Sequence, residues 1–131
     1  MTREELKAAA TAMLDRAYVP YSHFPVGAAL ECSDGAVFTG CNVENASYPA
    51  GLCAERNAIF HAVAEGHTSF LRIVVAGRSE DFCVPCGVCR QLLYEFGGDA
   101  LLVIMAKSET DYREMTLGAL LPLGFGPEKV L

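Results

Sequence analysis

Three cysteines and one glutamate have the types and spacing for metal chemistry. Glu55 follows Cys53 by two residues, while Cys86 and Cys89 stand three residues apart, directly after Pro85. Three thiolates can fill three corners of a tetrahedral Zn²⁺ ion and leave the fourth for water, which distinguishes a catalytic zinc site from a closed structural one. The pattern therefore predicts zinc bound by Cys53, Cys86 and Cys89.

Glu55 has the position of a proton carrier. It lies close enough to a ligand to stand beside a metal-bound water without having to bind the metal itself. Zinc lowers the pKa of bound water towards about 7, which makes hydroxide available to attack the amidine-like carbon of an aminopyrimidine. Glu55 can then take the water proton and pass protons to the ring nitrogen and to the leaving ammonia. A Cys or His ligand, a Glu two residues on and a later Pro-Cys-x-x-Cys are the signature of zinc-dependent nucleobase deaminases.

Three thiolates give the zinc cluster a net negative charge, which weakens the metal as a Lewis acid. Arg56, Arg90 and Gln91 flank the ligands and can donate hydrogen bonds to the sulfurs. We expect Arg56 to be the main compensating group and Gln91 to support it.

A closed structural site with four cysteines is the main alternative. Cys83 stands three residues before Cys86, so it could complete such a site. Val84 precedes a proline and is biased to extended geometry, so we expect Cys83 to point away from Cys86 and Cys89. A closed site would also leave Glu55 without a role. A lone Cys-x-x-Cys pair is more often a structural half-site or a redox pair, and only the combined pattern favours catalysis.

Length and charge narrow the functional classes. With 131 residues we expect one domain, residues 1–131. The net charge of −6 and the absence of a Lys/Arg cluster disfavour a nucleic-acid partner. A small, weakly charged substrate fits better. The hydrophobic share of 52% is high enough to suggest a subunit interface.

Two features point to a cytoplasmic protein without a membrane partner. No apolar run approaches the roughly 18 residues of a membrane span, and the segment 1–5 lacks the basic and apolar parts of a signal peptide. Six cysteines could form three disulfides, but only in an oxidising compartment. Metal ligands or free thiols are therefore the favoured interpretation.

The remaining residues predict alternating helices and strands. A capping box at Thr2 and Glu5 starts a helix that we expect to reach about Tyr18. Further helices are predicted from Cys53 to a stop at Gly66, and from Pro85 to 97–98. The other predicted elements are a hairpin at 26–30 and 37–41, an irregular loop at 42–52, buried strands at 71–76 and 101–105, a short helix at 116–121 and a tail at 122–131. This order indicates a sheet with helices on its faces and a last crossover that is parallel and right-handed.

Four segments resemble one known family over nearly the whole chain. They are 18–30 (YVPYSHFPVGAAL), 40–48 (GCNVENASY), 53–56 (CAER) and 85–91 (PCGVCRQ). With them the sequence closely resembles the small homotetrameric, zinc-dependent cytidine deaminases of pyrimidine salvage. The resemblance implies a three-layer α/β/α fold with a five-stranded mixed sheet, one zinc ion per subunit and a pyrimidine nucleoside as substrate.

The resemblance also implies roles for individual residues. It makes Cys53, Cys86 and Cys89 the zinc ligands and Glu55 the proton shuttle. It further places Phe24 beside the pyrimidine, Asn42 and Glu44 on the ribose hydroxyls, the Ala54 backbone on the base, and Phe125 in the site of a neighbouring subunit. Taken alone, these substrate-side residues would have ordinary packing, turn or surface roles.

Other functions remain open at this point. A deaminase of a cytosine-nucleoside antibiotic of the blasticidin type shares the Cys-Ala-Glu and Pro-Cys-Gly-x-Cys-Arg-Gln segments, but the loop 42–48 resembles the ribose-binding version. Editing of cytosine in RNA or DNA would require a basic groove, which the net charge of −6 disfavours. A non-enzymatic zinc module would have a closed metal site. The favoured function is deamination of cytidine and 2′-deoxycytidine.

Overall fold

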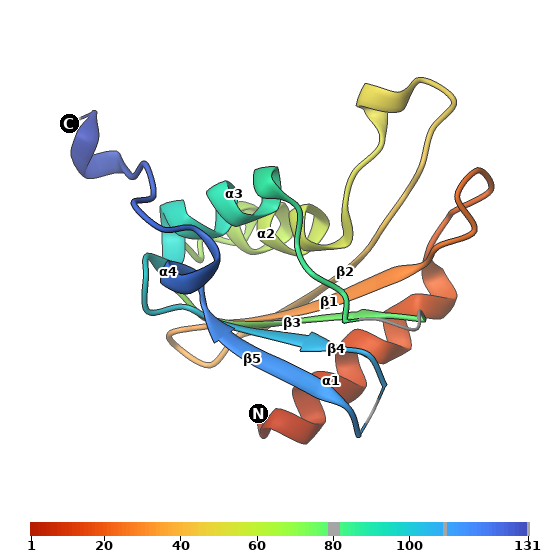
Figure 1. Cartoon of the computed structure of the whole chain (residues 1–131), viewed down its shortest axis with the longest axis horizontal. Helices are drawn as coiled ribbons and strands as arrows, with labels where there is room; N and C mark the ends of the chain where they lie inside the picture. Colours follow the sequence, from red (N-terminus) through yellow and green to blue (C-terminus); the bar gives the residue numbers. More distant parts are fainter. Residues whose placement is uncertain (79–81, 109, 131) are drawn as a thin grey trace.

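The computed structural model describes residues 1–78, 82–108 and 110–130. These residues form a mixed five-stranded sheet in the order β2-β1-β3-β4-β5 (Figure 1). The strands are β1 (Val26–Cys32), β2 (Val37–Cys41), β3 (Phe70–Gly77), β4 (Leu102–Ala106) and β5 (Tyr112–Thr116), and the helices are α1 (Arg3–Ala12), α2 (Ala54–Ala64), α3 (Gly87–Gly97) and α4 (Leu117–Leu120). None of the described helices is long and apolar enough to cross a membrane.

The first helix begins as predicted and ends earlier. Thr2 and Glu5 form the capping box, because the Thr2 hydroxyl accepts from the Glu5 N–H and the Glu5 carboxylate accepts from the Thr2 N–H. The prediction that this helix reaches Tyr18 was wrong. The chain tightens into a 3₁₀ turn at Met13–Arg16, and Tyr18 pairs with Val43 in an isolated bridge.

The sheet combines an antiparallel hairpin with one parallel crossover. β1 pairs antiparallel with both β2 and β3, and β3 pairs parallel with β4. This confirms the hairpin and the parallel crossover that the apolar runs predicted. Sequence patterning missed β5, whose five residues alternate poorly because Arg113 and Glu114 are both exposed. Only the family resemblance implied this fifth, edge strand.

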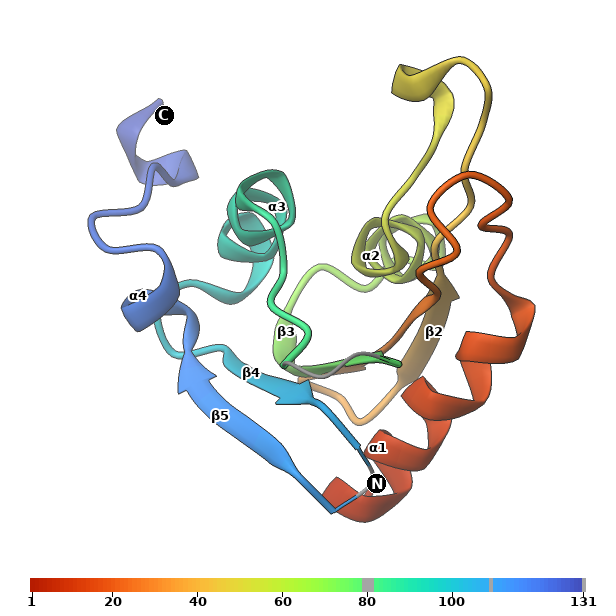
Figure 2. The same ribbon diagram turned by 45° about the vertical axis from the view of Figure 1, so that its right-hand side comes forward.

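Three layers follow from the way each strand points its side chains. α1 covers one face of the sheet, and α2 and α3 cover the other (Figure 2). Adjacent residues of β3 point to opposite faces of the sheet. Val74 packs in the hydrophobic cluster with Leu6 of α1, whereas Ile73 and Val75 pack in the cluster with Ile59 of α2. The predicted α/β/α class is therefore confirmed.

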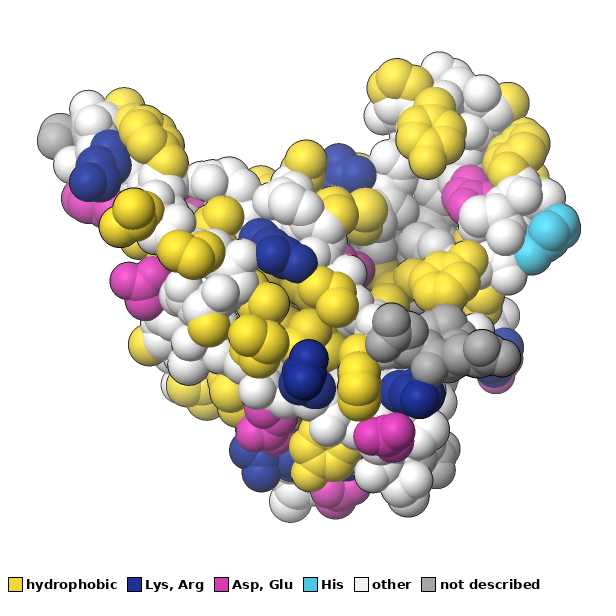
Figure 3. Space-filling model, viewed as in Figure 1, with side chains coloured by type: hydrophobic (Ala, Val, Ile, Leu, Met, Phe, Trp, Pro, Cys, Tyr) yellow, Lys and Arg dark blue, Asp and Glu magenta, His cyan; other side chains and the backbone are white. Residues whose placement is uncertain are grey.

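Two segments project from the layered body. The loop 42–52 leaves the end of β2, and the C-terminal tail leaves α4 on the opposite side (Figure 1). Both carry hydrophobic side chains at the surface (Figure 3). Tyr48 is 93% exposed on the loop, and Phe125 and Val130 are 59% and 71% exposed on the tail.

Gly40 of β2 sets how closely α2 can approach the sheet. A Cβ at this position would lie 2.4 Å from the Ala54 carbonyl oxygen and 2.7 Å from the Ala58 nitrogen. Both atoms belong to the backbone of α2, so a small side chain cannot be accommodated by rotating a neighbour. The absence of a Cβ therefore lets the first turn of α2 lie directly against β2.

We expect Gly40→Ala to destabilise the protein by about 1–3 kcal/mol, as overpacking typically does. Its thermal midpoint in the metal-free protein should fall by several degrees. The control is Gly87→Ala, because a Cβ at Gly87 has nothing within 4 Å and the residue begins α3. Equal midpoints for the two variants would contradict this account of Gly40.

Candidate active site

Two helices begin at the predicted metal ligands. Cys53 is the N-cap of α2 and Cys86 is the N-cap of α3. The prediction that Pro85 opens the second helix was wrong by two residues, because the helix starts at Gly87 and Cys86 keeps an extended backbone. Neither cysteine caps its own helix with a side-chain hydrogen bond in the described chain. Both helix N-termini thus leave N–H dipoles near the sulfurs, where they favour thiolate.

The three predicted ligands meet in space. The Sγ atoms of Cys53 and Cys86 lie 4.0 Å apart, and those of Cys86 and Cys89 lie 3.5 Å apart. All three sulfurs lie within 4.8 Å of one another. Tetrahedral zinc with Zn–S bonds of about 2.3 Å requires sulfurs about 3.8 Å apart. The group therefore fits a zinc ion with little rearrangement.

The three sulfur atoms are within hydrogen-bonding distance of one another, and one arginine donates to the group. The pKa of the Cys53 thiol is lowered to about 5, first by the hydrogen bond from Cys89 and then by Arg56. The pKa of Cys89 is raised, because its thiol proton is held by Cys53 and because it is buried. Arg56 Nη2 donates to Cys53 Sγ at 3.5 Å, so the guanidinium lies where a compensating charge was predicted. A thiolate on Cys53 is therefore favoured before metal binds, while Cys89 keeps its proton.

Glu55 lies beside this cluster in a buried position. The residue is 4% exposed, in the first turn of α2. Burial raises the pKa of its carboxyl and the Cys53 thiolate adds to the effect, while hydrogen bonds from its own backbone and from Cys89 partly offset the rise. A carboxyl whose pKa is raised in this way holds a proton more readily than an exposed glutamate, as a proton carrier requires.

Cys83 lies outside the metal-binding group. The one group of metal-binding side chains in the described chain contains Cys53, Cys86 and Cys89. Cys83 is 8% exposed, and its Sγ is 3.3 Å from where a Cβ of Gly77 would be. Burial, together with the charge of Glu55, raises its pKa to about 12, which favours the neutral thiol. The geometry therefore disfavours a closed four-cysteine site.

An open cleft of about 600 Å³ connects the sulfur cluster to the loop 42–52. Its wall includes two predicted ribose contacts, Asn42 and Glu44, together with Cys53 and Arg56. The other lining residues are Tyr21, Ser22, Val43, Asn45, Ala46, Tyr48, Gly51 and Leu52. The cleft thus joins a metal-binding end to an end that carries a carboxylate and an amide.

Glu44 and Asn42 are held by the neighbouring loop. Glu44 Oε1 accepts from the backbone N–H groups of Tyr21 and Ser22, both at 3.1 Å. Asn42 donates to the Phe24 carbonyl at 2.9 Å and accepts from the Val26 N–H at 2.8 Å. Tyr21 and Ser22 were not predicted as site residues, because a serine or tyrosine in a loop carries no signal of such a bond.

The remaining predicted residues lie around the cluster or on the tail. Ala54 is fully buried as the first residue of α2. Phe24 is 39% exposed, and its ring tip lies 3.6 Å from a Cβ built on Gly77. Arg90, one of the flanking residues predicted to bond the sulfurs, instead donates to the carbonyls of Pro85 and Leu120, both at 2.8 Å.

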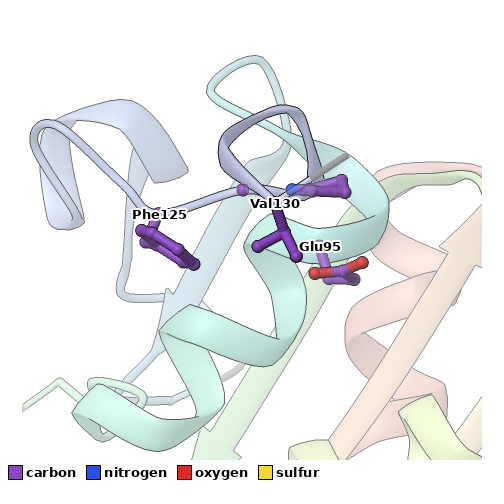
Figure 4. A pocket seen from close by; sticks show the side chains of 5 residues that line it. Glu95, Phe125 and Val130 are labelled. Carbon is purple, nitrogen blue, oxygen red and sulfur yellow. The ribbon is translucent and has the colours of Figure 1, made fainter.

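Gln91 bonds the tail. Its Nε2 donates to the Phe125 carbonyl at 2.7 Å, which fixes the backbone of the tail beside α3. The Phe125 side chain lines a pocket of about 270 Å³ together with Glu95 and Val130 (Figure 4). In the single chain, Phe125 therefore lines this second pocket and not the cleft at Cys53.

A sulfur cluster at two helix N-termini, with a buried carboxyl beside it and a cleft leading to it, defines the class of zinc-dependent hydrolases that act on a small substrate. A family model described as "Cytidine and deoxycytidylate deaminase zinc-binding region" matches residues 1–119. The chain therefore belongs to the cytidine and deoxycytidylate deaminase family, and its relatives show it to be an enzyme of the cytidine deaminase type.

Individual relatives match along nearly their whole lengths. The crystal structure of cytidine deaminase from Burkholderia pseudomallei has a TM-score of 0.90 and 47% identity, and the match covers 95% of this chain and 100% of that one. Cytidine deaminase from Mycobacterium tuberculosis has a TM-score of 0.83 and 41% identity, with 96% and 98% covered. Cytidine deaminase from Sporosarcina psychrophila is 43% identical, with 98% of this chain and 94% of the relative covered.

We expect Cys83→Ala to retain about one zinc ion per chain and Cys89→Ala to lose most of it, because only Cys89 belongs to the sulfur group. Metal analysis after dialysis measures both. Cys32→Ala is the matched control, since this buried thiol does not belong to the sulfur group. Loss of zinc from Cys83→Ala but not from Cys32→Ala would instead indicate a closed four-cysteine site.

Proposed function

We propose that the protein deaminates cytidine and 2′-deoxycytidine hydrolytically to uridine and 2′-deoxyuridine, releasing ammonia, in the cytoplasm as a step of pyrimidine salvage. Residues 1–131 act as one domain. The observation that carries the proposal is the cleft, which runs from Glu44 and Asn42 to Cys53. A nucleoside has its sugar and its reacting base at opposite ends, and the cleft offers suitable groups at each end.

Cys53, Cys86 and Cys89 would hold one zinc ion per subunit. When bound, zinc supplies an activated water as the nucleophile. Arg56 offsets the negative charge of the three sulfurs through its bond to Cys53. In the described part of the chain, Gln91 does not bond the sulfurs directly. Its amide instead fixes the tail that follows α4, through the Phe125 carbonyl.

Glu55 moves the protons of the reaction. Its carboxyl takes a proton from the attacking water, delivers it to the pyrimidine ring nitrogen and then assists the leaving ammonia. Its burial at 4% exposure excludes competing water, and its raised pKa lets the carboxyl hold the proton between these steps. The Ala54 backbone, next to Glu55 at the start of α2, contacts the base.

The sugar end of the cleft binds hydroxyl groups. Both backbone bonds to Glu44 reach Oε1, which leaves Oε2 for a ribose hydroxyl. Asn42 retains one amide hydrogen and one lone pair beyond its two backbone bonds. Phe24 packs beside the pyrimidine. The net charge of −6 argues against a nucleic-acid substrate.

We expect Glu55→Gln to lower kcat for cytidine by at least about 100-fold, because general acid–base catalysis contributes this much. Zinc content and thermal stability should stay close to those of the wild type. The measurement follows the loss of the amino chromophore in the ultraviolet spectrum. An active Glu55→Gln protein with bound zinc would contradict the mechanism.

The same assay defines the substrate. Purified zinc-loaded protein is incubated separately with cytidine, 2′-deoxycytidine, cytosine and blasticidin S. Turnover of both nucleosides but not of cytosine supports the proposed function and the need for the sugar contacts. Turnover of blasticidin S alone would overturn the roles of Asn42 and Glu44, and no turnover by zinc-bound protein would favour a non-enzymatic zinc module.

The exposed loop and tail support assembly into a homotetramer in which Phe125 completes the site of a neighbouring subunit. Tyr48, Phe125 and Val130 present apolar surface on segments that project from the body. Apolar side chains in such positions are typical of protein interfaces. In this proposal Gln91 fixes the backbone from which Phe125 reaches the partner.

We expect Phe125→Ala to lower kcat/KM for cytidine by roughly 2- to 10-fold, the typical worth of an aromatic contact. Leu123→Ala is the matched control on the same tail, since Leu123 is fully exposed. Co-expressed Phe125→Ala and Glu55→Gln chains should together exceed the summed activity of the separate variants, because a Glu55→Gln subunit can lend its Phe125. No gain on mixing, or an active monomer by size measurement, would remove Phe125 from the site.

A further inference from the structure

Ser22 lines the substrate cleft and bonds two residues that the proposed function places on the nucleoside. Its backbone N–H donates to Glu44 Oε1 at 3.1 Å, and its Oγ accepts from the Phe24 N–H, also at 3.1 Å. Glu44 is the sugar-binding carboxylate of the proposed function, and Phe24 is the aromatic beside the base. One exposed serine therefore connects two residues whose relative position matters for binding the nucleoside.

The hydroxyl proton of Ser22 is available to a second acceptor. A serine hydroxyl carries one proton and two lone pairs, and the Phe24 N–H uses a lone pair. The proton is then free to interact with the carboxylate of Glu44. The pKa of Glu44 is lowered, first by the Ser22 hydroxyl and further by the N–H groups of Ser22 and Tyr21. Ser22 thus bonds Phe24 through its hydroxyl and Glu44 through its backbone N–H.

The backbone around Ser22 is held in an unusual conformation. His23 has a φ of 57°, in the left-handed region that non-glycine residues rarely adopt. Its N–H donates to the Val19 carbonyl at 3.0 Å. A strained residue of this kind persists only where its surroundings fix it, and such residues concentrate at functional sites. Here the turn directs Ser22 Oγ back towards the Phe24 N–H.

The other side of Phe24 is fixed by Asn42. The Phe24 N–H bonds Ser22, and the Phe24 carbonyl accepts from Asn42 Nδ2 at 2.9 Å. Two side chains thus satisfy the two polar backbone groups of Phe24. Backbone bonds also join the segments, because the Tyr18 N–H donates to the Asn42 carbonyl at 3.0 Å and the Glu44 N–H donates to the Tyr18 carbonyl at 2.8 Å. Backbone bonds thus fix the loop as a whole, and the side chains of Asn42 and Ser22 fix Phe24 within it.

We propose that Ser22 is a positioning residue for nucleoside binding, which orients Glu44 towards the sugar and holds Phe24 beside the base. This inference rests on the proposed function, because it uses the substrate roles of these two residues. It assigns Ser22 no contact with the reacting atoms. Loss of the hydroxyl should weaken nucleoside binding and leave the chemical step unchanged.

The test compares Ser22→Ala, Ser22→Thr and Ser47→Ala in the zinc-loaded protein. We expect Ser22→Ala to raise KM for cytidine about 3- to 10-fold, as loss of one hydrogen bond does, with kcat changed less than about 2-fold. Ser22→Thr keeps the hydroxyl and should restore most of the affinity. Ser47→Ala, on the loop that carries Glu44, should match the wild type.

A double-mutant cycle with Glu44→Gln separates positioning from direct contact. If Ser22 acts through Glu44, Ser22→Ala should cost less than about 2-fold in the Glu44→Gln background, because the charged acceptor is already gone. Fully additive losses would show that Ser22 does not act through Glu44 and would overturn the proposal. An unchanged KM in Ser22→Ala would overturn it as well.

Binding without turnover distinguishes failure of this inference from failure of the proposed function. Calorimetric titration of zinc-loaded Glu55→Gln protein with cytidine gives a dissociation constant, and the Glu55→Gln, Ser22→Ala double variant should raise it about 3- to 10-fold. A wild type that does not turn over cytidine refutes the proposed function. A wild type that does, with equal dissociation constants for these two proteins, refutes the role of Ser22 alone.

Discussion

The convergence of two helix N-termini is the constraint on which the rest of the structure depends. Cys53 and Cys86 each precede a helix by one residue, and their sulfurs come within 4.0 Å only because α2 and α3 cover the same face of the sheet. The parallel pairing of β3 with β4 forces the chain through α3 between these strands. The free N–H groups of both first turns then favour the thiolates that a metal requires. Displacing either helix would separate the ligands and move Glu55 away from them.

The site divides into a stiff end and an adjustable end. At the metal end, Glu55 and Cys89 are buried on regular helices, and Gly40 allows α2 to lie against β2 without a gap. At the sugar end, Glu44 lies on an irregular loop and depends on single hydrogen bonds from Tyr21 and Ser22. This division suits a hydrolase, because the chemistry requires fixed atoms whereas substrate entry requires a cleft that remains open.

Much of the fold followed from local sequence, and the differences have physical causes. The capping box at Thr2 and the glycine after α2 marked real helix ends, with Gly66 at a φ of 88°. The first helix was predicted too long because apolar residues continue at helical spacing to Tyr18, although the chain forms a 3₁₀ turn from Met13 to Arg16. Strand β5 escaped detection because an edge strand exposes most of its side chains and so lacks the alternation of a buried strand.

The sequence by itself determined the chemistry of this protein, because ligand types, their spacing and the nearby glutamate are local properties of the chain. It also identified the sulfur group, since Cys53, Cys86 and Cys89 meet as their spacing predicted. The tertiary structure decided where Cys83 lies, which partners Arg90 and Gln91 bond, and how Ser22 links Phe24 to Glu44. These contacts join side chains to backbone groups that the fold brings within reach, and a bond to a backbone atom leaves no signature in the identity of the residue that accepts it.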